Sequence, residues 1–340
     1  MIDFRSDTVT KPTATMRKAA YEAEVGDDVY KEDPSVNKLE EIAAEMLGKE
    51  GALFVTSGTQ GNQIAALTHC KPGDEVIMEA NAHVYVYEAG AFSALAGVQP
   101  RPIPGVRGAM DPFEVASAIR ADDIHFPETS LICLENTHNK AGGAVIPIDN
   151  MKAIYEIANS NRIPVHLDGA RLFNAAVASG KSVKDFASYA DTVQFCLSKG
   201  LGAPVGSIIA GPSEFIQKAR KWRKRLGGGL RQSGMIAAPG LVALQNNVDR
   251  LVEDHDNAKI LANGLGNING ITIVNEVETN IVIVDVSGTG YNAEQFVEEL
   301  RKKEILVGGY SSETVRFVTH YDVNVTQVKQ AIEKIDNLIN

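Results

Sequence analysis

Cysteine is rare in this sequence, and its copies are scattered. The chain of 340 residues has three, Cys70, Cys133 and Cys196, an odd number at wide spacing. Two of them lie inside apolar runs of strand length. This pattern argues against a disulfide framework and against a cysteine-based zinc cluster, so we expect the three thiols to be packed in the core.

Long apolar runs and an excess of positive charge are also missing. No stretch approaches the roughly 18 unbroken apolar residues of a membrane span, and the first ten residues lack the charged and apolar regions of a signal peptide. With 33 basic against 43 acidic residues, the formal net charge is -10, which disfavours attraction to nucleic acid or to an anionic membrane. We therefore expect a cytoplasmic protein that acts on small molecules.

One basic run, QKARKWRKR at 217–225, departs from this balance. Its six basic residues fall on a predicted helix, and Phe215, Ile216, Ala219 and Trp222 are available to dock that helix on the protein. No nucleic-acid-binding module accompanies the run. We interpret it as a solvated helix face.

What the sequence does have is a regular alternation of short apolar runs and helical patterns between about residues 50 and 210. Such alternation predicts an α/β fold with a mostly parallel sheet covered by helices on both faces. The expected helices include 60–68 and 151–160. The expected strands are ALFVTS (52–57), EVIME (75–79), SLICLE (130–135), IPVHLD (163–168), DTVQFCL (191–197) and GSIIAG (206–211).

The last part of the chain has a different pattern of predicted elements. After a helix at 214–225 and the loop GGGLRQSG, the segment 235–266 can link two domains, and strands then mix with helices in a small α+β domain. Two of these helices open with asparagine and carry glutamine three residues later, Asn292 with Gln295 and Asn324 with Gln327, as in a capping box. We predict an N-terminal segment at 1–14 that contributes to the active site, a large domain at 15–250 and a small domain at 251–340.

Polar residues follow three of the predicted central strands, where ligands bind in such sheets. Asp168 ends one strand, and Lys199 comes just after another, in FCLSKGLGAPVGS (195–207). On its own, Lys199 fits a solvated loop charge, the usual role of lysine, or an amine that forms a Schiff base in a cleft. His166 and Asp168 fall on one strand face and also fit part of a metal site, although no third ligand lies near them in sequence.

The stretch SGTQGNQ (57–63) joins a strand to a helix, so the N–H groups of Gly58 and Thr59 would form a phosphate cradle at the helix N-terminus. A plain turn with a serine cap is the alternative. The glycines of GLGAPVG (200–206) do not form a nicotinamide site, because Pro204 and the strand-like run after it deny the required helix. A phosphate cradle, a strand-end aspartate and a lysine together meet the needs of pyridoxal 5'-phosphate.

Eight motifs, in matching order along essentially the whole chain, resemble the low-specificity L-threonine aldolase family. That family belongs to the beta-eliminating lyase and threonine aldolase superfamily, on the aspartate aminotransferase-like fold (fold type I) of pyridoxal-phosphate enzymes. The motifs are RSDTVT (5–10), GDDVYKEDPSVNKLE (26–40), FVTSGTQGN (54–62), HVYVYEAG (83–90), LENTHN (134–139), HLDGARLFNA (166–175), FCLSKGLGAPVGS (195–207) and GGGLRQSG (227–234).

The resemblance implies roles for the residues in these motifs and for two more. It makes Lys199 the Schiff-base lysine and Asp168 the partner of the pyridine nitrogen, with His83 stacked on the cofactor ring. It places Gly58, Thr59 and Ser198 at the phosphate, together with Arg231 from a neighbouring subunit. It implies that Arg171, Arg316 and Ser6 bind the substrate, and that Arg171 also lies near the cofactor's phenolic oxygen. It places His125 near the substrate hydroxyl.

The same resemblance implies cleavage of L-threonine and L-allo-threonine to glycine and acetaldehyde, by a homotetramer with active sites between subunits and without a catalytic metal. His83, His125 or a water held by them would be the base, because neutral imidazole accepts a proton near neutral pH. A beta-eliminating lyase or an aminotransferase on the same fold would use the same Lys199 and Asp168. A binding protein with a vestigial cofactor fold would have no reason to retain both of them with two arginines.

Overall fold

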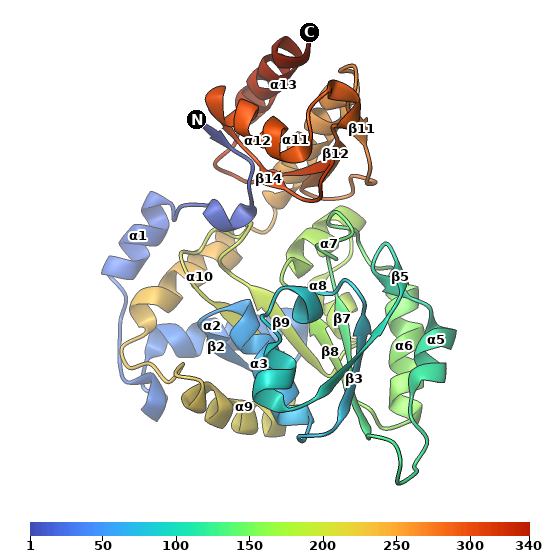
Figure 1. Cartoon of the computed structure of the whole chain (residues 1–340). Helices are drawn as coiled ribbons and strands as arrows, with labels where there is room; N and C mark the ends of the chain where they lie inside the picture. Colours follow the sequence, from blue (N-terminus) through green and yellow to red (C-terminus); the bar gives the residue numbers. More distant parts are fainter.

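The computed structural model describes all 340 residues, and its centre is a seven-stranded sheet in the order β2-β10-β9-β8-β7-β3-β4 (Figure 1). Every neighbouring pair from β9 to β4 is parallel, and only β10 runs antiparallel to both of its neighbours. The predicted α/β class with a mostly parallel sheet is therefore confirmed. The strands are β2 (Gly51–Val55), β3 (Glu75–Glu79), β4 (Gln99–Ile103), β7 (Thr129–Glu135), β8 (Val165–Asp168), β9 (Thr192–Cys196) and β10 (Ser207–Gly211).

The two faces of this sheet differ in chemistry. On one face, alternate residues such as Leu167, Val193 and Phe195 join the main apolar core. That core also takes in the helices α2 (Pro34–Leu47), α6 (Ile148–Ser160), α7 (Leu172–Ser179), α8 (Val183–Ala187) and α10 (Gly234–Asn246). Helices α3 (Gly58–His69) and α9 (Ser213–Arg225) pack with apolar residues of β2 and β10 on the other face. Because side chains alternate along a strand, the buried polar residues of β8 and β9 lie on this second face, under α3.

The C-terminal part forms a separate antiparallel sheet in the order β11-β12-β15-β14, with its own apolar core. Its helices α11 (Leu251–Leu265) and α13 (Val325–Ile339) pack together. Both predicted asparagine caps, at the starts of α12 (Ala293–Lys302) and α13, form complete capping boxes. The strands are β11 (Thr272–Ile273), β12 (Ile281–Asp285), β14 (Gly308–Gly309) and β15 (Thr314–Val318).

The N-terminal segment joins this C-terminal part. Strand β1 (Ile2–Asp3) pairs in parallel with β13 (Ile305–Leu306), and the N-terminus lies beside the C-terminal sheet and helices in Figure 1. The chain then crosses to the large sheet, where the Thr10 hydroxyl donates to the carbonyl oxygen of Lys199 at 3.0 Å. The segment therefore spans the cleft between the two sheets. The other helices are α1 (Ala14–Tyr21), α4 (His83–Val86) and α5 (Pro112–Ala118), and none of the chain's helices is long and apolar enough to cross a membrane.

Candidate active site

Two cavities meet at the carboxyl ends of β8 and β9, and both are lined by Lys199 and His83. The first, of about 190 Å³, is lined by Ser57, Gly58, Thr59, Asn62, Glu88, Asp168, Ala170, Gln194, Cys196 and Ser198 besides these two. The second, of about 340 Å³, is lined by Ser6, Thr8, Tyr87, Asn139, Arg171, Gly309, Tyr310 and Arg316 besides the same two. The first cavity lies against the large sheet, and the second opens between the two sheets. We call them the sheet chamber and the cleft chamber.

The sheet chamber has an anion cradle at one end. Ser57 caps helix α3 by accepting a hydrogen bond from the N–H of Gln60, which leaves the preceding N–H groups of the first turn unbonded within the helix. A Cβ atom at Gly58 would come within 2.8 Å of Gln194 Nε2 and 2.9 Å of Cys196 Sγ. Only glycine therefore leaves this turn close to the sheet, with its N–H groups at the positive end of the helix dipole.

Asp168 lies deep in the sheet chamber, at the end of β8, and is 2% exposed. Its Oδ2 accepts a hydrogen bond from Asn62 Nδ2 at 2.9 Å, and its Oδ1 accepts one from the N–H of Ala170 at 3.1 Å. No lysine, arginine or histidine pairs with it within the chain. A buried carboxylate without a cation is costly, so this site suits a ligand that brings a positively charged N–H group.

Lys199 lies directly beyond β9, where a tight loop holds its backbone. Its carbonyl oxygen accepts hydrogen bonds from Thr10 Oγ1 at 3.0 Å and from the N–H of Gly202 at 2.8 Å. Gly202 has a φ of 79°, a conformation that favours glycine. The amine makes no hydrogen bond or ion pair within the chain, although it lies in both chambers. The structure thus presents a free amine on a rigid backbone.

His83 begins α4 and forms the boundary between the chambers. Its backbone N–H donates to Glu135 Oε2 at 2.6 Å, and its ring Nδ1 lies 3.1 Å from Glu88 Oε1. Burial works to lower the pKa of His83, but the hydrogen bond to Glu88 and the nearby Asp168 carboxylate outweigh it, so the pKa lies above its ordinary value. The ring can therefore take up a proton near neutral pH.

Two arginines converge on the cleft chamber. Arg171 forms a bidentate pair with Asp7, Nε to Oδ2 at 2.7 Å and Nη2 to Oδ1 at 2.8 Å, which leaves Nη1 facing Asn139 Oδ1 at 3.5 Å. Arg316, on β15, donates from Nη1 to the same Asn139 oxygen at 3.1 Å. Ser6 also lines this chamber. Together the two guanidinium groups can bind a carboxylate.

The structure of one chain does not bring two of the predicted residues to this site. His125 lies in the loop before β7, at the amino ends of the parallel strands and thus opposite the chambers. Its side chain is 77% exposed there and bonds to Asp123 at 2.6 Å. Arg231 pairs with Asp27 at 2.9 Å and lines neither chamber. Within one chain, neither residue lines a chamber.

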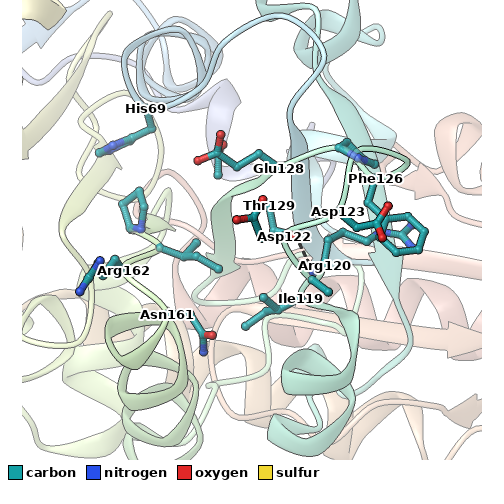
Figure 2. Close-up of a pocket in the computed structure, with 15 residues that line it drawn as sticks. His69, Ile119, Arg120, Asp122, Asp123, Phe126, Glu128, Thr129, Asn161 and Arg162 are labelled. Atoms are coloured by element: carbon teal, nitrogen blue, oxygen red, sulfur yellow. Dashed lines mark hydrogen bonds between the residues drawn. The ribbon is translucent and has the colours of Figure 1, made fainter.

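A larger cavity of about 720 Å³ lies at these amino ends, and its labelled residues in Figure 2 include His69, Arg120, Asp123, Glu128 and Arg162. Its charged groups are of both signs, and Arg120 already bonds to buried Glu75. The lining of this cavity therefore does not favour a ligand of either charge.

His166 is not available as a metal ligand. Its Nδ1 lies 3.0 Å from Thr192 Oγ1, and its Nε2 lies 3.0 Å from Asn62 Oδ1, so both ring nitrogens have partners. Burial lowers the pKa of His166 to about 4, which keeps the ring neutral. Its role is inside the hydrogen-bond network beneath Asp168.

Four residues of the site went without a role in the sequence analysis: Asp7, Asn62, Glu88 and Asn139. All four fall inside the quoted motifs, but their partners include residues up to 273 positions away in the chain. The one available signal was position. Asp7, Asn62 and Glu88 each lie in a motif that otherwise carries a cofactor or substrate contact.

Comparison with known proteins agrees with this geometry. Residues 3–289 match the family model described as beta-eliminating lyase. The chain is 45% identical over 331 residues to the low specificity L-threonine aldolase of Escherichia coli (strain K12), covering 97% of each protein. It is 46% identical over 333 residues to low-specificity L-threonine aldolase 1 of Arabidopsis thaliana, covering 96% of this chain and 93% of that protein.

A solved structure of the threonine aldolase of Leishmania major has the same fold, with a TM-score of 0.86, 19% identity and complete coverage of both chains. The chain therefore belongs to the pyridoxal-phosphate-dependent beta-eliminating lyase family, among its low-specificity L-threonine aldolases.

Proposed function

We propose that this protein holds pyridoxal 5'-phosphate on Lys199 and cleaves L-threonine and L-allo-threonine to glycine and acetaldehyde. The observation that carries the proposal is that one free amine, Lys199, lies in both chambers. The sheet chamber offers an anion cradle and an unpaired carboxylate, and the cleft chamber offers two arginines. A phosphate-bearing cofactor and an amino acid would therefore meet at the same nitrogen.

The residues of the sheet chamber fit the cofactor. The N–H groups of Gly58 and Thr59, with the Ser198 hydroxyl, would hold the phosphate, and Asp168 would accept a hydrogen bond from the protonated pyridine nitrogen. His83 would cover the ring on the side away from the sheet. When bound, the cofactor supplies an electron-accepting ring for the bond that breaks at Cα of the substrate.

The cleft chamber would orient the amino acid. Arg316 and the Nη1 of Arg171, which both face Asn139 Oδ1, would bind its carboxylate, with Ser6 as a further hydrogen-bond partner. Fixing the carboxylate decides which bond at Cα is aligned for cleavage, and here that bond is Cα–Cβ. A beta-eliminating lyase or an aminotransferase would differ in this alignment.

Cleavage requires a base for the β-hydroxyl proton. His83 is the imidazole that this chain itself supplies, and its Nε2 would take the proton directly or through a water, as acetaldehyde leaves. Cα then receives a proton, and glycine is released. His125 would have this role only if another subunit brings it to the site.

We also propose that the active protein is a cytoplasmic homotetramer. Arg231 would then reach the phosphate of a neighbouring site, as the family resemblance implies. Exposed Tyr85, Val86 and Tyr87, next to His83, support an interface beside the chambers. Sedimentation of the holoenzyme tests the assembly.

The decisive assay measures acetaldehyde and glycine released from L-threonine and L-allo-threonine by wild type and by Lys199→Ala, with added cofactor. Wild type should release both products in equal amounts, and Lys199→Ala should lose the rate and the protein-bound absorbance of the cofactor. A 2-oxo acid without glycine would instead indicate elimination or transamination. Wild type that binds cofactor and releases no product would refute the aldolase assignment.

A further inference from the structure

A buried glutamate beside His83 has no part in the function proposed above. The side chain of Glu88 is fully buried, and no lysine or arginine pairs with it. Its Oε1 accepts a hydrogen bond from Asn62 Nδ2 at 2.8 Å, and its Oε2 accepts one from Gln63 Nε2 at 2.8 Å. Its remaining partner is His83 Nδ1. A buried carboxylate held this way accepts at every contact.

These contacts define the proton positions on His83. Because both amide partners donate, Glu88 acts as an acceptor, and the Nδ1 of His83 must carry the proton that it shares with Glu88. The neutral ring then has its lone pair on Nε2. That nitrogen makes no hydrogen bond within the chain, and the ring lines both chambers.

The orientation of Asn62 is itself determined by a chain of hydrogen bonds across the sheet. Its Nδ2 serves both Glu88 and Asp168, and its Oδ1 faces His166 Nε2. His166 Nδ1 faces Thr192 Oγ1, which in turn lies 3.1 Å from His69 Nε2, at the cavity of Figure 2. Burial lowers the pKa of His69 to about 3, so both histidines stay neutral, and donors and acceptors alternate without conflict.

We propose that Glu88 is a positioning residue that fixes the tautomer and ring orientation of His83, so that Nε2 is the proton acceptor, and that Asn62 holds Glu88 in place. The role of Nε2 as base rests on the proposed function. The tautomer does not, because it follows from the hydrogen bonds alone. Histidine tautomers set by a partner carboxylate are a general device in catalysis.

Charge and position can be separated by Glu88→Gln. The new amide can keep its oxygen on His83 and Asn62 and turn its nitrogen to Gln63, whose Oε1 is buried without a partner and can accept after a flip of that amide. The shape is preserved, and the negative charge is lost. Groups that still face His83 are Asp168 from β8, Lys199 from the loop after β9, Glu135 from β7 and Tyr87 from its own segment.

The experiment records long-range 1H–15N spectra of the holoenzyme labelled with 15N-histidine, across pH. The chain has seven histidines, and His83→Asn assigns the signal of His83. Wild type should show the proton on Nδ1 in the neutral form. In Glu88→Gln the same tautomer should persist, while the pKa of His83 falls by about one unit because an opposite charge is removed.

Kinetics give a second readout. In Glu88→Gln the acid limb of the kcat profile should move to lower pH with the pKa of His83, and the plateau should fall about tenfold because the base is weaker. The KM for L-threonine should change less than about twofold, because the arginines bind the carboxylate. Glu75→Gln is the matched control, a buried carboxylate at the far edge of the sheet, and should leave the titration of His83 unchanged.

Two results would overturn the inference. One is a wild-type ring protonated on Nε2, a result that does not depend on the Glu88→Gln variant. The other is a Glu88→Gln enzyme whose His83 titrates as in wild type. Failure of the aldolase proposal is seen separately, as wild type that releases no acetaldehyde whatever the tautomer of His83.

Discussion

Removing the charge of Asp7 should weaken both the fold and substrate binding, because this carboxylate is the counterion of a buried guanidinium. Asp7 is 0% exposed, and Arg171 is 6% exposed. Burial alone would raise the pKa of Asp7, but Arg171, with a smaller contribution from Lys199, holds it far below its ordinary value. The change Asp7→Asn keeps the shape and leaves Arg171 buried without a counterion.

The magnitude follows from that burial. Breaking a buried ion pair by removing one partner costs about 3–5 kcal/mol, whereas an exposed pair contributes about 0–1 kcal/mol. Asp3 and Arg5 form a far less buried pair at 2.6 Å in the same N-terminal segment, with side chains 24% and 53% exposed, so Asp3→Asn is the matched control. Urea unfolding should show the large loss in Asp7→Asn and the small one in Asp3→Asn.

The stability that Asp7 contributes should depend on pH in a definite direction. Because the folded-state pKa of Asp7 is depressed, its stabilisation is present above the unfolded-state pKa of about 4 and is lost as the pH falls through the folded-state value. The difference between wild type and Asp7→Asn should therefore shrink below about pH 4. An Asp7→Asn variant within about 1 kcal/mol of wild type at pH 7 would refute the reasoning.

Three further predictions use other parts of the structure. Arg316→Leu should raise the KM for L-threonine about 100-fold with the cofactor still bound, and an unchanged KM would remove Arg316 from the carboxylate site. Asn292→Ala removes the capping box of α12 and should lower the free energy of unfolding by about 1 kcal/mol in urea titrations, with kcat unaffected. Gly108→Ala should destabilise the fold by about 1–3 kcal/mol, since φ is 87° and the added Cβ would come within 2.3 Å of His138; a stable variant would contradict this.

The apolar pattern predicted most of the central sheet, and its failures have physical reasons. EVIME matches β3 residue for residue, because a buried strand between turns leaves a clear signal. Strand β4 was missed since its sequence QPRPI carries two prolines, which a sheet accepts only at an edge, and β4 is the edge strand. The antiparallel direction of β10 was not predicted, because alternation does not encode direction.

Some residues of the candidate site were also predictable from the sequence, and others were not. Lys199 and Asp168 were found because they follow apolar strands, and the structure places both in one cavity. Asp7 and Glu88 look like ordinary charges in sequence, because what distinguishes them is burial beside Arg171 and His83. His125 was expected at the substrate, but one chain holds it at the other edge of the sheet. Contacts between distant segments or subunits leave no local pattern.

The N-terminal segment has a consequence for how the protein is made. Strand β1 is synthesised about 300 residues before β13, with which it pairs, and Asp7 also receives a hydrogen bond from Asn280, 273 residues later. The large sheet can form while synthesis continues, because its strands end at Gly211. The cleft chamber, in contrast, also needs Ser6, Arg171 and Arg316 in place. A nascent chain can therefore shape the sheet chamber before it can complete a substrate site, which delays assembly of the substrate site until Arg316 has been synthesised.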